Sequence, residues 1–280
     1  MANKNSQIFG GDWTEKKLNI FEKYLRAYIM ALKEQNFSKV YIDAFAGTGT
    51  IYTKDGKLLD GSARIALSSS PKFDKYFFVE QDYHKYLELK KMIREEFPEL
   101  EHKVVCLRGD ANELLNYIIN RVNWGSSRGL LFIDPYATQF DWSTLVNVSK
   151  TYAIDVWYLF PFSALNRMLT RDGEIVESWR KKIDSVLGCS DWYDFFYKPD
   201  PQISLFDEEK EQYIKDVDTN ELKGYIIERL ETIFPAVSKN PRVFYNSTNS
   251  PLFLLCFAVS NKSKKAIDLA MRIASDILSR

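Results

Sequence analysis

The stretch that decides the fold runs from residue 39 to residue 49 and reads Lys39-Val40-Tyr41-Ile42-Asp43-Ala44-Phe45-Ala46-Gly47-Thr48-Gly49. Its first part is a β-rich apolar run, and its last part is a glycine turn that allows close approach of the backbone. A buried strand that ends in an acid and a glycine turn is typical of the first strand of a doubly wound α/β sheet. The stretch therefore predicts that fold class and a candidate binding turn at residues 47–49.

Apolar runs and helical patterns alternate along the rest of the chain. Four further strand-like runs cover residues 75–80, 103–107, 129–135 and 154–161. Continuous apolar strands separated by helices are what a parallel sheet buried on both faces requires. Two last runs, residues 242–246 and 252–259, flank a turn-rich link and predict a C-terminal antiparallel hairpin. We predict a mostly parallel seven-stranded sheet, which matches a Rossmann-like methyltransferase fold better than an NAD-binding one.

The alternation breaks after the fifth strand. Residues 163–216 are rich in charged and aromatic side chains and contain Lys198-Pro199-Asp200-Pro201. We therefore predict one Rossmann-like domain from residues 1–162 and 217–280, with a helical insert at 163–216. The insert is either a small satellite core or a lobe that binds a substrate or partner beside the sheet edge.

Composition narrows the functional classes. The chain of 280 residues has 38 basic and 38 acidic side chains, so it lacks the basic excess that is usual in nucleic-acid-binding proteins. No apolar run approaches the ~20 residues that span a bilayer, and the first residues have no signal-peptide pattern. The 3 cysteines and 2 histidines show no zinc-ligand spacing, so we expect no metal site. The expectation is a soluble cytoplasmic protein without membrane contact.

Four acids follow four consecutive strands at the edge where a doubly wound sheet binds ligands. They are Asp43, Glu80, Asp110 and Asp134. A dinucleotide-binding turn requires a third glycine three residues after Gly49, and Tyr52 stands there. S-adenosylmethionine (SAM) has no phosphate and needs only a turn that its amino-acid moiety can approach.

The acids suggest roles toward SAM. Glu80 can accept from both hydroxyls of a ribose, although it can also cap the next helix together with Asp82. Asp110 can accept the amine of adenine, with the backbone N–H of Ala111 beside it, or serve as a helix N-cap. Both roles of Asp110 are compatible with each other.

At this point the motifs resemble a known family. Residues 43–49 are similar to the D-x-F-A-G-x-G motif I of SAM-dependent methyltransferases. With Gly61-Ser62-Ala63, Glu80, Gly109-Asp110 and the run from Phe132 to Tyr136, residues 12–162 resemble the three-Cys-motif partner (TcmP) family. Its members are bacterial methyltransferase-like proteins, named for a neighbouring protein with a three-cysteine, radical-SAM-like motif. The resemblance implies SAM as cofactor and that protein as partner. The predicted cofactor-binding residues are Asp43, Phe45, Gly47, Gly49, Glu80, Asp110 and Ala111.

The turn Asp134-Pro135-Tyr136 is the candidate catalytic set. It resembles the D/N-P-P-Y/F motif of methyltransferases that act on base amines, in which the acid and a carbonyl accept from the amine and the aromatic ring stacks on the base. Here Tyr136 replaces the second proline, and Ala137 stands at the aromatic position. Alternatively, Asp134 closes the cofactor site and Tyr136 packs against the protein.

Two functions remain open at this stage. The first is a SAM-dependent methyltransferase that acts on a nucleic-acid base amine or on a partner macromolecule. The second is a catalytically inactive SAM-fold subunit that works with a three-Cys-motif partner. An NAD-dependent oxidoreductase is a distant third, because Tyr52 opposes it.

Overall fold

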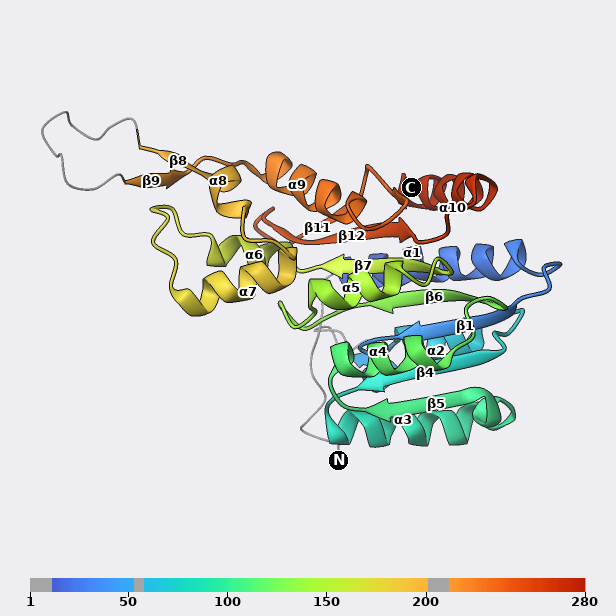
Figure 1. Ribbon diagram of the computed structural model, residues 1–280. Coiled ribbons are helices and arrows are strands. Elements are labelled where there is room, and N and C mark those ends of the chain that lie inside the picture. The colour runs from blue at the N-terminus through green and yellow to red at the C-terminus, as the bar shows by residue number, and fades with distance from the viewer. Residues whose placement is uncertain (1–11, 53–57, 201–211, 280) are drawn as a thin grey trace, which may run out of the picture.

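The structure is a computed structural model that describes residues 12–52, 58–200 and 212–279. Its centre is a twisted sheet (Figure 1). Five parallel strands occupy the order β5-β4-β1-β6-β7. They are β1 (Ser38–Asp43), β4 (Lys75–Glu80), β5 (Val104–Arg108), β6 (Ser127–Ile133) and β7 (Ile154–Phe160).

The sheet is completed by antiparallel strands beside β7. β12 (Pro251–Val259) pairs with β7, and its other edge pairs with β11 (Arg242–Tyr245) and with β10 (Ala236–Val237). The predicted Rossmann-like methyltransferase fold and its C-terminal hairpin are confirmed. The two-residue β10 brings the central sheet to eight strands among the described residues, one more than predicted, because a segment this short has no readable pattern.

Two layers of helices cover the sheet (Figure 1). Along β1, Val40 and Ile42 point into one hydrophobic cluster, and Tyr41 points into the other. The cluster that contains Tyr41 is completed by side chains of α1 (Asp12–Ala31), α2 (Ser62–Ser68), α3 (Tyr83–Glu96) and α10 (Lys264–Leu278). The cluster that contains Val40 and Ile42 is completed by side chains that include those of α4 (Ala111–Arg121), α5 (Trp142–Ser149) and α9 (Thr219–Glu231). This double burial explains the continuous apolar strands in the sequence.

The insert lies at the end of the sheet toward which the parallel strands point (Figure 1). It contains α6 (Phe162–Met168), α7 (Glu177–Leu187), α8 (Trp192–Phe196) and the antiparallel pair β8 (Tyr197–Pro199) and β9 (Tyr213–Lys215). Its buried residues Ile183, Trp192 and Phe196 belong to the same hydrophobic cluster as the second face of the sheet. The alternative of a separate satellite core is therefore wrong.

A small hairpin separates the glycine turn from the helix that follows it. β2 (Thr50–Tyr52) pairs with β3 (Leu58–Asp60), and α2 begins only after Gly61. A 3-10 helix, η1 (Pro98–Lys103), connects α3 to β5. Within the described ranges, no helix is both long and apolar enough to cross a membrane.

Candidate functional site

The predicted acids lie together because parallel strands end at the same edge. Asp43 is in register with Phe78 of β4 and with Phe132 of β6, so the ends of these three strands are aligned within two residues. The chain passes from β1 to β4 on one side and later places β6 on the other side. This reversal at β1 is the topological switch point where doubly wound sheets bind ligands.

The glycine turn is held by Glu80. Gly47 and Gly49 have φ values of +60° and +80°, a region that residues with a Cβ rarely adopt. The backbone N–H of Gly47 donates to Glu80 Oε2 over 2.9 Å, and the N–H of Asp82 donates to Oε1 over 2.8 Å. Glu80 thus supports both the turn and the start of α3. Each of its oxygens keeps a further lone pair, so a role toward a ribose stays compatible with this support.

The turn has a packed side and an open side. The N–H of Gly61 donates to the Gly49 carbonyl over 2.9 Å, and a Cβ on Gly61 would lie 2.9 Å from the Gly49 carbonyl carbon. A Cβ on Gly47 would meet no atom within 4 Å. A ligand can therefore approach the backbone at Gly47, while Gly61 supports the turn from behind.

Asp43 is buried completely, so it acts through its neighbours. Its carboxylate accepts from the Tyr41 hydroxyl over 3.1 Å, from the Phe45 N–H over 3.2 Å and from the Ser62 side chain. Burial raises the pKa of Asp43 to about 6, and these hydrogen bonds oppose the rise. The negative charge of Asp134 adds to it. Asp43 thus fixes the backbone entering the turn and the first residue of α2.

Asp110 is the N-cap of α4. Its Oδ1 accepts from the backbone N–H groups of Asn112 (2.8 Å) and Glu113 (3.2 Å). The capping role is confirmed, and Oδ2 has no hydrogen-bond partner among the residues that the structure describes. Ala111 is the first residue of α4 and is buried. An adenine role for Asp110 stays a prediction that this geometry allows.

Asp134 is held by a lysine that the sequence motifs did not indicate. Lys17 Nζ donates to Asp134 Oδ2 in an ion pair between side chains that are 4% and 27% exposed. Lys17 also lies 5.3 Å from the centre of the Trp13 ring. The available signal was its place on α1, four residues before the buried Phe21, where an apolar side chain is expected. A buried lysine requires a partner, and the strand-end acids were the candidates.

The other two residues of the candidate catalytic turn, Pro135 and Tyr136, differ in their exposure to solvent. Pro135 is buried, whereas the ring of Tyr136 is 69% exposed and precedes Ala137, which has a φ of +53°. The alternative in which Tyr136 packs against the protein is therefore wrong. Phe45 is half-buried, with its ring centroid 6.2 Å from that of Phe140 just beyond the turn. Phe45 thus supports the loop after β6 from the neighbouring strand end.

Comparison with known proteins finds weak similarity to solved structures and no match to a family. No family model matches the chain, and no curated protein matches it. A Legionella pneumophila protein described by the family model DUF519 has a TM-score of 0.46 and 12% identity, covering 92% of this chain and 91% of that one. The methyltransferase domain of bacterial CtHen1 has a TM-score of 0.38 and 12% identity, covering 86% of this chain and 99% of that one.

A third solved structure is similar to the chain at the same low level. A protein from Klebsiella pneumoniae described as a putative O-methyltransferase has a TM-score of 0.38 and 10% identity, covering 90% of this chain and 92% of that one. All three TM-scores are below 0.5 and all three identities are below 25%, so these similarities carry no argument about the function of this chain. A function for this chain has to be argued from its own residues.

Proposed function

We propose that this protein binds SAM and transfers its methyl group to an amine, either of a nucleic-acid base or of a partner macromolecule. The observation that carries the proposal is the placement of the Asp134-Pro135-Tyr136 turn at the switch point. There the acid is ion-paired to Lys17, and the aromatic ring is exposed.

The residues around the glycine turn fit SAM. Gly47 leaves open space for a ligand beside its backbone, and the carboxylates of Glu80 and Asp110 each retain acceptor capacity. A dinucleotide fits less well, because its pyrophosphate binds at a helix N-terminus directly after the glycines. Here the chain enters β2 after Gly49, and Tyr52 lies in that strand. This geometry strengthens the argument against an NAD-dependent oxidoreductase.

The turn after β6 has the groups that methylation of an amine needs. SAM supplies a methyl group on a sulfonium, and its leaving group departs neutral, so catalysis rests mainly on positioning and exclusion of water. Asp134 accepts a hydrogen bond from the incoming amine and directs the nitrogen lone pair toward the methyl group. Lys17 keeps the Asp134 carboxylate in place through their ion pair. Tyr136 offers its exposed ring for stacking on a planar acceptor.

Two features bear on the acceptor. The turn is related to the motif of methyltransferases that act on base amines, which favours a nucleic-acid base. The net charge of zero argues against tight electrostatic binding of nucleic acid. The resemblance to the TcmP family adds a three-Cys-motif protein as a partner, with the insert as its binding lobe.

The second candidate function is an inactive SAM-fold subunit. It is favoured by the missing second proline, by Ala137 at the aromatic position and by Lys17, which already uses one oxygen of Asp134. Under this proposal the ion pair is a structural tie, and the protein binds SAM or a partner without transferring a methyl group.

Calorimetry and methyl transfer separate these proposals. We expect SAM and S-adenosylhomocysteine to bind and NAD not to bind; binding of NAD alone would overturn the cofactor assignment. Labelled SAM is then offered with DNA, with RNA and with co-purified protein. We expect Asp134→Ala to bind SAM within a few-fold of the parent but to lose at least ~100-fold in transfer, about 2.7 kcal/mol.

Tyr136→Ala is expected to lose transfer in a similar way, since stacking on a base is worth ~1–3 kcal/mol. Tyr117→Ala is the matched control, because Tyr117 is an exposed aromatic residue on the outer helix α4. If Asp134→Ala transfers as fast as the parent, the acceptor site lies elsewhere. If the parent binds SAM and methylates no substrate class, the inactive subunit becomes the better proposal.

A further inference from the structure

The glycine turn is not continuous with the helix that usually follows it. In a doubly wound fold the first strand, the turn and the helix run on directly, and the first turn of the helix fixes the glycines. Here the β2–β3 hairpin comes between them, so Gly47-Thr48-Gly49 is followed by a strand. Glycine has the largest backbone freedom of all residues, and this turn contains two. Other contacts must therefore fix its conformation.

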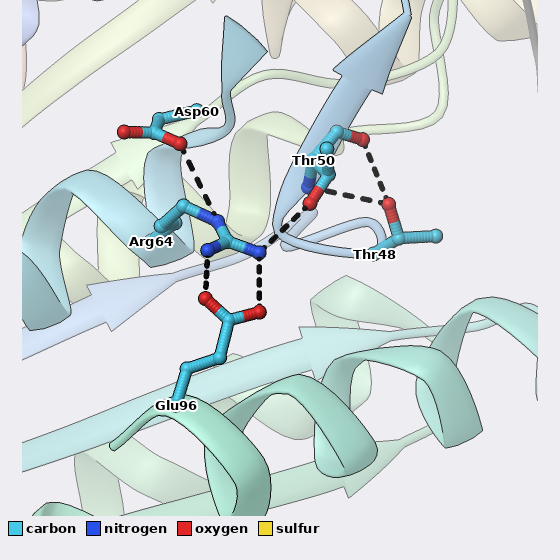
Figure 2. A network of polar contacts seen from close by, with 5 residues as sticks. All are labelled: Thr48, Thr50, Asp60, Arg64 and Glu96. Atoms are coloured by element: carbon cyan, nitrogen blue, oxygen red, sulfur yellow. Dashed lines mark hydrogen bonds and ion pairs between the residues drawn. The ribbon is translucent and has the colours of Figure 1, made fainter. Parts of the chain in front are cut away.

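Arg64 makes the contacts that replace this continuity (Figure 2). It is the third residue of α2, and its side chain is 19% exposed. Its Nη2 donates to Thr50 Oγ1 over 3.2 Å and to Glu96 Oε1 over 2.9 Å. Its Nη1 binds the other oxygen of Glu96, and its Nε lies 3.4 Å from Asp60 Oδ1. The guanidinium thus joins the start of β2, the end of β3 and the last residue of α3.

Thr48 extends this chain of contacts into the turn. Its Oγ1 donates to the Thr50 carbonyl over 2.8 Å and accepts from the Thr50 N–H over 3.3 Å (Figure 2). Thr48 stands between the two glycines with positive φ. Polar contacts therefore run without interruption from Glu96 through Arg64 and Thr50 to the centre of the turn.

We propose that Arg64 is a positioning residue for ligand binding: it holds the glycine turn in the conformation that receives the ligand. The inference rests on the proposed function, because it takes SAM as the ligand of the turn. A turn ordered before binding does not have to lose its conformational entropy when the ligand arrives. Loss of Arg64 should therefore weaken cofactor affinity and leave turnover at saturating cofactor unchanged.

The test compares Arg64→Ala with Arg94→Ala. Arg94 lies on α3 and pairs with Glu101 at 3.8 Å, but its side chain is 70% exposed, and within the described residues it forms no ion pair with the turn. We expect about a tenfold rise in the Kd of S-adenosylhomocysteine for Arg64→Ala and no change for Arg94→Ala, both by calorimetry. We also expect Arg64→Ala to raise the KM for SAM while kcat stays within about twofold of the parent.

A double-mutant cycle shows whether the effect passes through Thr50. Thr50→Ala alone should weaken binding, and Arg64→Ala combined with Thr50→Ala should be no weaker than Arg64→Ala alone. Arg64→Lys should restore only part of the affinity, because an ammonium cannot reproduce the planar fork between Glu96 and Thr50. Strictly additive losses would overturn a path through Thr50.

Hydrogen exchange separates this inference from the proposed function. Measured without ligand, the amides of Thr48 and Gly49 should exchange faster in Arg64→Ala than in Arg94→Ala. Equal exchange together with an unchanged Kd would overturn the role of Arg64. A parent that binds neither SAM nor S-adenosylhomocysteine, with faster exchange in Arg64→Ala, would overturn SAM as the ligand and retain Arg64 as the residue that orders the turn.

Discussion

Lys17 Nζ and Asp134 Oδ2 form an ion pair that joins the first helix of the fold to the end of β6, across 117 positions of sequence. Lys17 is almost completely buried, and Asp134 is about one quarter exposed. The pair therefore places the buried face of α1 against the candidate acceptor turn. It makes α1 part of the site, which the motifs alone did not indicate.

The first prediction concerns the stability of this pair. Replacing Lys17 with Met leaves the Asp134 carboxylate beside an apolar side chain, and breaking a buried pair on one side is costly. Because Asp134 is partly exposed, we expect a loss of about 2 kcal/mol in the free energy of unfolding. Urea denaturation at neutral pH measures it.

The control for this prediction is Lys16→Met, because Lys16 is the exposed neighbour of Lys17 on α1. Its effect should be within about 0.5 kcal/mol of zero. Combining Lys17→Met with Asp134→Asn should recover much of the lost stability, since the unpaired charge is removed. Equal losses for Lys16→Met and Lys17→Met would mean that the pair contributes nothing.

The second prediction concerns pH. Burial raises the pKa of Asp43 to about 6 from its ordinary 3.8, so the folded protein holds this proton more tightly than the unfolded chain. The contribution of Asp43 to stability is therefore fully present below about pH 4 and is lost as the pH rises through about 6. Asp43→Asn cannot titrate, so its stability relative to the parent should rise by about 3 kcal/mol between about pH 4 and pH 7.

Urea titrations at several pH values measure the free energy of unfolding of Asp43→Asn and of the parent. The test is how the difference between the two changes with pH, because any pH-independent effect of the substitution shifts all its values equally. Asp155→Asn is the comparison variant, because burial raises the pKa of Asp155 to about 7 and the Tyr24 hydroxyl opposes the rise with a hydrogen bond. The stability of Asp155→Asn relative to the parent should continue to rise to higher pH than that of Asp43→Asn. Parallel pH profiles for Asp43→Asn and the parent would show that Asp43 does not titrate in this range.

The third prediction uses the open side of the turn. Gly47→Ala places its Cβ in empty space, so the structural cost is the left-handed φ, about 1–2 kcal/mol. If a ligand occupies that space, its affinity should fall at least about tenfold in a protein that still folds. The control Gly224→Ala also meets open space but lies inside α9, where Ala should add about 0.5–1 kcal/mol of stability and leave binding unchanged. Unchanged SAM affinity in Gly47→Ala would place the ligand elsewhere.

The fourth prediction concerns Glu80. Glu80→Ala removes both the acceptor for the Gly47 N–H and the acceptor expected for a ribose, so SAM affinity should fall by roughly 1–3 kcal/mol. Glu80→Gln keeps one acceptor oxygen, so its SAM affinity should fall less than that of Glu80→Ala. Calorimetry measures both, with Glu88→Ala on the exposed side of α3 as control. A folded Glu80→Ala that binds SAM like the parent would limit Glu80 to its structural contacts.

The sequence was sufficient for features that depend on local pattern. Apolar runs such as residues 129–133 predicted buried strands, and the acids that follow them predicted a polar edge, because parallel strands all end on one side. The glycines at 47 and 49 predicted a turn, because a turn of this kind needs residues that adopt positive φ. Gly47 and Gly49 both have positive φ. The N-cap role of Asp110 is local in the same way.

Only the tertiary structure decided which of these polar groups meet one another and which face solvent. Lys17 and Asp134, or Arg64 and Glu96, lie on different elements, and their pairing depends on how the helices pack on the sheet. The same packing buries Asp43 completely and leaves Tyr136 in solvent, although Asp43 ends an apolar strand and Tyr136 follows one closely. A residue pattern sets the period and the ends of an element through local sterics and hydrogen bonds. Burial and charge pairing arise only when distant elements come together, so no local pattern encodes them.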